Sequence, residues 1–446
     1  MFARVDNIGA VACSPEDVLV QKVLSNPPVL DNRSFLSKFG PGVITAAADD
    51  DPSGIGTYCI AGAAFGFTTL WTVLVLFPLM IAVQFTCAKI GMVTGTGLTA
   101  VLRKHYHRGL MYPLVFLLVA ANSINAGADI SAIASAFNLL LPIPVNVLIL
   151  PVAVSILAMQ LLGSYKLIAS IFKWLTLALF AYVASAFFVK LDPSIIAHHT
   201  FVPSVRFDGA FITMLLAILG TSISPYLFFW QADQEVEEKI SLGQKRLWQR
   251  RGCDKSQLKH RLWDIKAGMF FATMVMYFVI LVTGATLFKA GHHNIGSATE
   301  AAEALRPFAG KHATVLFALG IIGSGYLAVP ILTTSGAYAV SQMFGWTHGL
   351  DHKFGQAKEF YTLITLSTIA GMIIPALGIN PMSALFWTAV INGIVAIPLL
   401  FMILLIANNK KIMGAHTNGL LTNVLGWIAT MLMFGAGIAM LFWGGN

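Results

Sequence analysis

Long apolar segments separated by short polar connections dominate the chain. The segments 70–83, 110–121, 145–162 and 391–407 contain no Asp, Glu, Lys or Arg. A helix needs about 20 mostly apolar residues to cross the hydrocarbon core of a bilayer. The pattern predicts eleven such spans, at about 39–64, 68–92, 109–139, 143–163, 167–190, 209–232, 267–288, 312–341, 360–378, 383–407 and 419–443.

The composition supports the same prediction. Only 11% of the residues are charged and the mean hydropathy is +0.76, whereas a soluble domain carries about 25% charged residues. In lipid, every backbone polar group must be bonded within its own segment, so these spans are expected to be helices. The sequence lacks the alternating pattern of barrel strands. We therefore expect an all-α membrane protein.

The basic residues indicate how the spans are oriented. If the polar segment Met1–Lys38 is cytoplasmic, the external connections hold five of the 28 Lys and Arg residues and the cytoplasmic side holds the other 23. This bias places the N-terminus inside, and eleven spans place the C-terminus outside. The net charge of +8 then reflects orientation and predicts no nucleic-acid partner. We expect a multi-pass protein of a bacterial inner membrane, without a cleaved signal peptide because Met1–Lys38 has no apolar core.

Spans one and six share an interruption by proline and small or polar residues. Span one reads AAADDDPSGIG at 46–56, and span six reads LGTSISPY at 219–226. Interrupted helices at corresponding positions of two halves point to a transporter binding site. An odd number of spans per half gives the halves opposite orientations, so we predict a five-plus-five inverted repeat. The expected organisation is a cytoplasmic tail (1–38), a transport core (39–407, with repeats 39–190 and 209–407), and a short cytoplasmic loop with an additional eleventh helix (408–446).

Asp51 is the centre of the predicted site. It lies 12 residues after Phe39, which at 1.5 Å per residue is roughly 18 Å, near the middle of a ~30 Å core. An ionised carboxylate at that depth costs several kcal/mol unless something compensates it. Pro52 and Gly54 favour unwound backbone, which would leave free carbonyls beside the acid. A carboxylate that caps the following half-helix is the structural alternative.

The predicted ligands around Asp51 are all oxygen atoms. Small neighbours, Gly54 and Ser224, suit a partly hydrated ion, and carbonyl and hydroxyl groups near Thr221 would face Asp51. Hard divalent cations prefer oxygen ligands, and the break contains no Met or Cys to favour a softer metal. Asp49 and Asp50 are expected in an aqueous vestibule or in a partly solvated turn, because three successive carboxylates cannot all face one ion.

Two further polar residues lie deep in apolar spans. Asp129 in span three shares a helix face with Asn125, and either a pathway role or an interhelical hydrogen bond would explain it. Asn392 in span ten is either a site contact or a packing amide. The histidines are interpreted as loop residues, and the four cysteines, which lack metal-ligand spacing, as packing residues or free thiols.

These residues resemble the NRAMP divalent-metal transporters, through 51–54 in span one, the break before Pro225 and the lead-in 40–42. The resemblance implies a LeuT-type fold over roughly 39–407. It matches Asp51 to the metal-binding Asp, Ala48 and Thr221 to positions that offer carbonyls, and Asp129 to an acid linked to proton transfer. The family motifs are Asp-Pro-Gly-Asn and Met-Pro-His. Three positions depart from these motifs, with Gly54 in place of Asn, Ser224 in place of Met and Tyr226 in place of His. Ala132 also replaces an expected acid.

The departures resemble the NRAMP-related magnesium transporter branch. We therefore expect an importer of Mg²⁺ that also accepts Mn²⁺, works by alternating access and needs no obligatory proton coupling. It is expected to be no enzyme and to use no cofactor, and its oligomeric state is left open. The alternative is a proton-coupled Mn²⁺ or Fe²⁺ importer of the same family. An amino-acid carrier of the same fold is a further alternative, although 49–51 would repel a substrate carboxylate.

Overall fold

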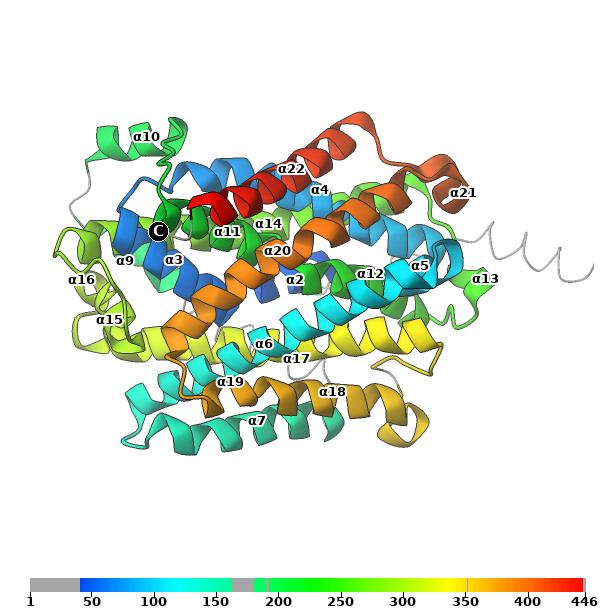
Figure 1. Cartoon of the computed structure of the whole chain (residues 1–446), viewed down its shortest axis with the longest axis horizontal. Coiled ribbons are helices and arrows are strands. Elements are labelled where there is room, and N and C mark those ends of the chain that lie inside the picture. The colour runs from blue at the N-terminus through cyan, green and yellow to red at the C-terminus, as the bar shows by residue number, and fades with distance from the viewer. Residues whose placement is uncertain (1–40, 163–179, 190–191, 351, 444–446) are drawn as a thin grey trace, which may run out of the picture. The chain divides into compact units, whose positions relative to one another are not determined.

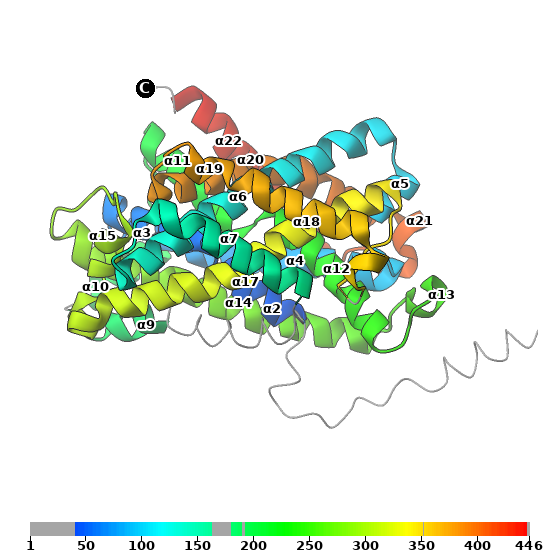
Figure 2. The ribbon, with the colours of Figure 1, turned by 90° about the horizontal axis from the view of Figure 1, so that it is seen from below.

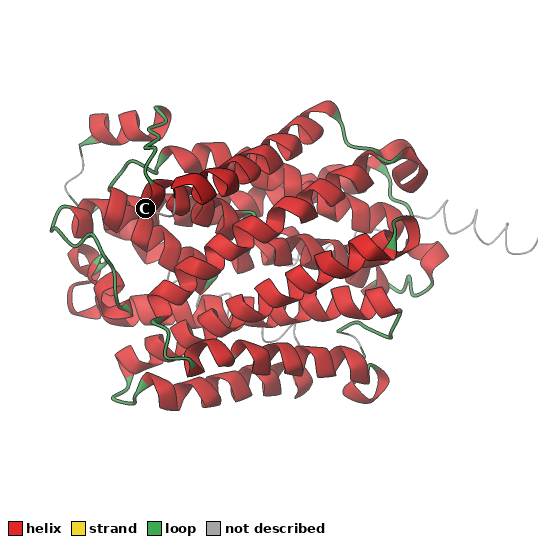
Figure 3. Cartoon of the chain, viewed as in Figure 1, coloured by secondary structure: helices red, strands yellow, loops and turns green. Residues whose placement is uncertain are grey.

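The computed structural model describes residues 41–162, 180–189, 192–350 and 352–443, and helices make up nearly all of the regular structure there (Figure 3). The predicted tail 1–38 and most of the predicted fifth span lie outside the described residues. The helices that form the body are α2 (Pro41–Asp49), α3 (Pro52–Phe65), α4 (Trp71–Thr94), α6 (Arg108–Leu140), α7 (Val145–Leu162), α11 (Gly209–Ser222), α12 (Pro225–Ser241), α14 (Lys255–Thr283), α17 (Ala313–Phe344), α18 (Lys358–Gly371), α20 (Pro381–Asn408) and α22 (Leu420–Trp443).

Shorter helices connect these elements. A π-helical segment, Gly284–Phe288, continues α14. The remaining α-helices are α5 (Leu98–His105), α9 (Ala181–Ala186), α10 (Pro193–Phe201), α13 (Leu247–Arg250), α15 (Ala298–Glu303), α16 (Arg306–Ala309), α19 (Ile373–Ala376) and α21 (Lys410–Met413).

Nine segments of the described chain are long and apolar enough to cross a membrane. They correspond to nine of the eleven predicted spans, and the first predicted span is present as two short helices, α2 and α3, which together cover 41–65. Helices α7 and α22 expose large apolar side chains such as Leu150 and Leu421, as expected for surfaces that face lipid. The all-α architecture of a multi-pass membrane protein is therefore confirmed.

Both predicted interruptions are present. Helix α2 ends at Asp49 and α3 begins at Pro52, while α11 ends at Ser222 and α12 begins at Pro225. The residues before the two prolines, Asp51 and Ser224, have extended backbone, with φ/ψ of −68°/166° and −81°/136°. Proline disfavours the helical conformation in the preceding residue and lacks an N–H to continue the helix. Each proline therefore ends one half-helix and starts the next.

The half-helices pack in two pairs. Helix α2 contacts α12, and α3 contacts α11. Around them, α14 lies against α2, α3 and α4, and α20 lies against α11 and α3. Helices α6 and α17 form the largest contact of the molecule, with α7 and α18 beside them (Figures 1 and 2). We call α2 and α12 the inner pair, because the predicted orientation places their far ends at the cytoplasm, and α3 and α11 the outer pair.

Glycine allows α11 to approach α20 closely. A Cβ atom on Gly220 would lie 2.1 Å from the carbonyl oxygen of Ala389 and 2.4 Å from the backbone nitrogen of Gly393. Such distances are far below a van der Waals contact, so a side chain at this position would separate the helices. The outer half of span six is thus in backbone contact with α20.

The helix that contains span seven begins 12 residues, about three turns, before the predicted start of the span. We expected the span at 267, but α14 begins at Lys255, where Asp254 and Gln257 form a capping box. The hydropathy pattern misses this polar extension because it detects lipid-facing residues rather than helix. The basic connection 239–266 consequently contains helix, and its Arg261 is only 6% exposed.

Candidate metal site at the helix breaks

The Asp51 carboxylate lies at the break of span one and is 1% exposed. Its Oδ1 accepts hydrogen bonds from the backbone N–H of Gly54 (2.6 Å) and from the Ser53 hydroxyl (2.9 Å). Its Oδ2 accepts from the amide of Asn125 (3.1 Å) and lies 3.4 Å from the Tyr226 hydroxyl. These donors come from three elements, so Asp51 is where α3, α6 and α12 meet.

The local sequence explains this position. Asp51 is the N-cap of α3 and Pro52 is its first residue, an arrangement that satisfies one of the free N–H groups of a helix start. The structural alternative of a capping carboxylate therefore holds in part. It leaves Oδ2 for partners outside the helix, and the longest of these contacts, to Tyr226, is the one that a bound ion would most easily replace.

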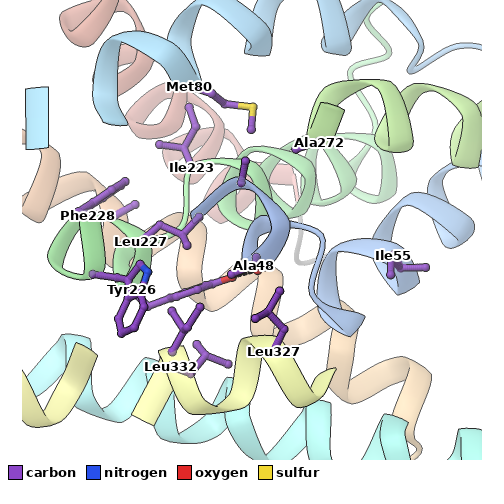
Figure 4. Close-up of a cluster of buried hydrophobic side chains, with 14 of the residues drawn as sticks. Ala48, Ile55, Met80, Ile223, Tyr226, Leu227, Phe228, Ala272, Leu327 and Leu332 are labelled. Carbon is purple, nitrogen blue, oxygen red and sulfur yellow. Dashed lines mark hydrogen bonds between the residues drawn. The ribbon is translucent and has the colours of Figure 1, made fainter. Parts of the chain in front are cut away.

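Tyr226 connects the two breaks. Its hydroxyl donates to the carbonyl oxygen of Ala48 at 2.8 Å, and its side chain is fully buried. Figure 4 shows Tyr226 extending toward Ala48, with Leu327 and Leu332 of α17 beside it. Ala48 is in the last turn of α2, where carbonyl groups have no helical partner and the helix dipole is negative. The carbonyl predicted to bind a cation is therefore oriented by a phenol.

Three oxygen atoms from both breaks surround the open side of Gly54. A Cβ atom there would lie 3.0 Å from Thr221 Oγ1 and 3.3 Å from both the Asp49 carbonyl oxygen and Asp51 Oδ1. Thr221 Oγ1 is buried and has no hydrogen-bond partner in the part of the chain that the structure describes. The absence of a side chain at Gly54 therefore brings the hydroxyl of span six close to the carboxylate of span one.

Ser224 bonds to its own half-helix. Its hydroxyl donates to the carbonyl oxygens of Gly220 (2.8 Å) and Thr221 (2.6 Å), which lie at the C-terminal end of α11. The Thr221 carbonyl keeps one lone pair for another partner. In this arrangement Ser224 orients a predicted carbonyl ligand.

Asp49 and Asp50 are buried, at 1% and 5% exposure. Helices α12, α14 and α17 pack around α2 and cover both acids in this structure, and the vestibule role of Asp49 and Asp50 stays a prediction. Asp49 Oδ1 has no hydrogen-bond partner among the described residues. Two acids beside Asp51 add to the demand for a cation or for protons at the break.

Further unpaired polar atoms lie on the neighbouring helices. Within the described ranges, both carboxylate oxygens of Asp129, both amide atoms of Asn392 and Oδ1 of Asn125 are buried without a hydrogen-bond partner. A buried polar atom without a partner costs about 1–3 kcal/mol, so water or an ion is expected at these positions.

Asn125 is the contact that sequence reasoning missed. Asn125 shares a helix face with Asp129, and its bond to Asp51 across 74 residues has no local signature. Over the described chain, no three His, Cys, Asp or Glu side chains converge as a metal-binding group. A cation at Asp51 would therefore depend on carbonyl, hydroxyl, amide and water oxygens.

A cavity of about 390 Å³ lies on the outer side of the site. Its lining includes Gly56 of α3, which is five residues beyond Asp51, and polar residues of α6 and of the start of α7, namely Ser131, Ser135, Asn138 and Asn146. Leu385 of α20 also lines it and lies against Gly56, where a Cβ atom would be 2.9 Å from its Cδ1. The cavity borders α3 at Gly56, and the residues of the break itself, Asp51, Gly54 and Thr221, are not part of its lining.

Two interrupted helices around a buried acid define a class, that of LeuT-type membrane transporters. The nucleobase-cation-symport transporter Mhp1 shares this fold with a TM-score of 0.55, 12% identity and coverage of 91% of this chain and 90% of its own. The Eremococcus coleocola manganese transporter, solved with an aromatic bis-isothiourea substituted compound, is more similar, with a TM-score of 0.73, 18% identity and coverage of 93% and 88%.

The family follows from the sequence. Residues 42–443 match the Nramp family, described as natural resistance-associated macrophage protein-like, and the chain belongs to this family. It is 24% identical to the divalent metal cation transporter MntH of Bacillus subtilis (strain 168) over 98% of both chains. It is 26% identical to the metal transporter Nramp6 of Arabidopsis thaliana, over 94% of this chain and 82% of that protein. The protein is thus a divalent metal cation transporter and not an enzyme.

Proposed function

We propose that this protein imports divalent cations by alternating access, with Asp51 as the charged ligand. The carbonyls of Ala48 and Thr221, the Thr221 hydroxyl and retained water complete the shell, and Gly54 leaves room for that water. The C-terminal ends of α2 and α11 present the negative ends of two helix dipoles to the same position. One fixed carboxylate with neutral oxygens is the kind of site that holds a partly hydrated ion.

The chemistry of the ligands supports Mg²⁺ together with Mn²⁺. The observation that carries this proposal is that both breaks present oxygen around Asp51, with Ser224 and Tyr226 at the positions where the family has Met and His. Thioether sulfur favours softer transition metals, whereas carboxylate, carbonyl and water suit Mg²⁺ and Mn²⁺ alike. The site therefore lacks the element that would reject Mg²⁺, in keeping with the resemblance to the magnesium branch.

Proton-coupled import of Mn²⁺ or Fe²⁺ is the second candidate. The relatives support it more directly, because the similar solved structures are of a manganese transporter and none of the relatives named above is named for magnesium. Asp129 supports it as well, since a buried acid with two unpaired oxygens beside the break is suited to carry a proton. Ala132, in place of a second acid, speaks against a longer proton route.

The wider architecture is proposed on the same basis. Spans 39–190 and 209–407 would form the inverted repeats, with the eleventh helix added after them. The N-terminus would be cytoplasmic and the C-terminus external in a bacterial inner membrane. Asn392 would contact the hydration shell, while Asp49 and Asp50 would meet water when the inner side opens.

Calorimetric titration of the purified protein with Mg²⁺ and Mn²⁺ tests the site. Asp51→Asn is the informative variant, because the Asn side chain preserves the cap on α3 while it removes the charge. We expect binding of both ions to be lost while the melting temperature stays close to that of the wild type. Unchanged binding in Asp51→Asn would place the site elsewhere.

Transport in proteoliposomes separates the two candidates. Under the first, Mg²⁺ competes with Mn²⁺ uptake and uptake leaves the lumenal pH unchanged. Under the second, Mn²⁺ uptake acidifies the lumen, Mg²⁺ does not compete, and Asp129→Asn abolishes the acidification. The magnesium proposal is abandoned if the second set of results is obtained.

A further inference from the structure

Two buried tyrosines connect the half-helices, one on each side of the break. Tyr226 of α12 donates to the carbonyl of Ala48 in α2 at 2.8 Å. Tyr58 of α3 lies with its hydroxyl 3.0 Å from the Ser222 hydroxyl of α11. We call the first contact the inner brace and the second the outer brace. Both phenols are buried, with 0% and 1% of their surface exposed.

The donor in the outer brace follows from a third contact. The Ser222 hydroxyl lies 3.8 Å from Sδ of Met276 in α14 and donates to it. A serine hydroxyl has one proton, so when it is directed to Met276, Tyr58 is the donor to Ser222; in either direction the bond joins α3 to α11. In both braces, a tyrosine of the second half-helix of one span thus donates to an oxygen in the last turn of the first half-helix of the other span.

The two braces connect different pairs of half-helices. The inner brace holds together α2 and α12, and the outer brace holds together α3 and α11. Asp51 lies between the two pairs, and its Oδ2 also meets the Tyr226 hydroxyl at 3.4 Å. Separating either pair to admit water on that side must break the brace of that pair and leaves the other intact.

We propose that Tyr226 and Tyr58 are paired positioning residues that hold the inner and outer sides of the site closed in turn. This inference rests on the proposed alternating access. Opening toward the cytoplasm breaks the bond from Tyr226 to Ala48, and opening to the outside breaks the bond from Tyr58 to Ser222. Each bond is lost in only one of the two open states. The ratio of inward-open to outward-open molecules therefore depends on the difference in free energy between the two hydrogen bonds.

The magnitude follows from the ordinary strength of a hydrogen bond. Loss of one net bond shifts a two-state equilibrium about fivefold. Tyr→Phe removes the hydroxyl and keeps the ring that packs in the core, so each variant is expected to fold. The inner brace acts on a carbonyl proposed as a ligand, whereas the outer brace acts on a serine that is not among the proposed ligands. Tyr58→Phe is therefore a matched control for Tyr226→Phe.

Hydrogen–deuterium exchange of the full-length protein in lipid nanodiscs tests the proposal without any cation. In Tyr226→Phe, amides of 41–49 should exchange about fivefold faster while those of 52–65 are unchanged. In Tyr58→Phe, amides of 52–65 and 209–222 should exchange faster while those of 41–49 are unchanged. Ser222→Ala, which removes the acceptor, should reproduce Tyr58→Phe.

Transport kinetics give a second readout. If the two tyrosines only stabilised the fold, both variants would change KM in the same direction. For uptake from the outside, Tyr226→Phe should raise KM several-fold because fewer molecules face outward, and Tyr58→Phe should leave KM unchanged or lower it. The proposal is overturned if amide exchange becomes faster on the same side in both variants, or if the exchange rates change less than twofold in both. If wild-type protein moves no divalent cation, the proposed function fails, and the exchange data still decide whether the braces exist.

Discussion

The inner and outer pairs of half-helices are closed by different kinds of contact. On the inner side, Nε of Arg261 in α14 lies 2.8 Å from Oε1 of Glu235 in α12, and its other nitrogens contact Glu238 and Asp264. Asp264 in turn accepts the backbone N–H of Gly42 at the start of α2, at 2.9 Å. One guanidinium therefore connects α14 and α12 directly and reaches α2 through Asp264.

Close glycine contacts support both sides, since a Cβ atom on Gly91 of α4 would lie 2.4 Å from the carbonyl oxygen of Ala232 in α12. The outer side has such contacts without a buried ion pair among the described residues. Gly220 places α11 on α20, and a Cβ atom on Gly62 of α3 would lie 1.9 Å from Oγ1 of Thr283 in α14. Each outer half-helix is thus fixed to its own supporting helix, and the outer brace crosses between them. Charged contacts can exchange partners with water when they separate, whereas glycine contacts admit no adjustment. Under the proposed alternating access, separating the inner pair would expose buried charges, whereas separating the outer pair would not.

The largest effect is expected from Arg261→Met. The change leaves Glu235 and Asp264, whose side chains are 1% and 4% exposed, without their cation. Removing one member of a buried ion pair costs about 3–5 kcal/mol. Thermal unfolding in detergent should show this loss, and amides of 41–49 should exchange faster.

Adding Glu235→Gln and Asp264→Asn to Arg261→Met is the control, because the two buried partners are then neutral and only the half-exposed Glu238 keeps its charge. The triple variant should recover most of the lost stability. An Arg261→Met protein as stable as the wild type would mean that charge does not close the inner side.

Gly220→Ala is expected to have the next largest effect. The new methyl group would overlap the backbone of Ala389 and Gly393, and overpacking of this kind costs about 1–3 kcal/mol. The melting temperature should fall, and exchange should increase in 209–222.

Gly435→Ala provides the matched comparison for Gly220→Ala. Gly435 lies in α22, and no atom lies within 4 Å of a Cβ built on it, so an alanine there should be neutral or slightly stabilising. Equal behaviour of the two variants would contradict the close approach of α11 to α20.

Thr221→Val tests whether the half-helix α11 contributes a ligand to the bound cation. Valine has the shape of threonine and removes a buried hydroxyl that has no partner in the described structure, so stability should be unchanged or rise by about 1 kcal/mol. The dissociation constants for Mg²⁺ and Mn²⁺ from calorimetry should increase several-fold. Unaltered dissociation constants would show that the hydroxyl does not face the cation.

Arg206→Ala should have the smallest effect. Arg206 and Asp208 form an ion pair at 3.0 Å on the outer side, but their side chains are 59% and 42% exposed. Exposed pairs contribute about 0–1 kcal/mol, so the melting temperature should change by a degree or two at most. A loss comparable to that of Arg261→Met would remove the distinction between buried and exposed ion pairs.

The breaks and the central acid could be predicted because they have local causes. A proline with small neighbours interrupts a helix through its own geometry. Asp51 is conspicuous because a carboxylate inside an apolar span needs a compensating partner. The contacts of Tyr226 and Asn125 could not be predicted, since they depend on how α12 and α6 turn toward α2. The burial of Asp49 and Asp50 could not be predicted either. It results from the packing of α12, α14 and α17 over α2, which the local sequence does not reveal.

Arg261 shows a different limit of the sequence. It lies in a run of basic residues, which usually marks a solvated connection, and its burial requires carboxylates from two helices. The capping box at Asp254 and the spacing to Asp264 were readable signs that a helix had already begun. Local signals of helix ends would therefore have corrected the boundary, although they would not have identified the partners in α12.

Helix α2 is a short rod secured at both ends. It has nine residues, its first turn is bonded to Asp264 and its last turn to Tyr226. Six residues separate Gly42 from Ala48, which is about 9 Å of helix. If the bond at Ala48 breaks while the bond at Gly42 holds, a rotation of roughly 20° about that fixed end moves the carbonyl of Ala48 by about 3 Å. That displacement is about the diameter of a water molecule, so a modest pivot of one short rod is enough to hydrate the centre of the protein.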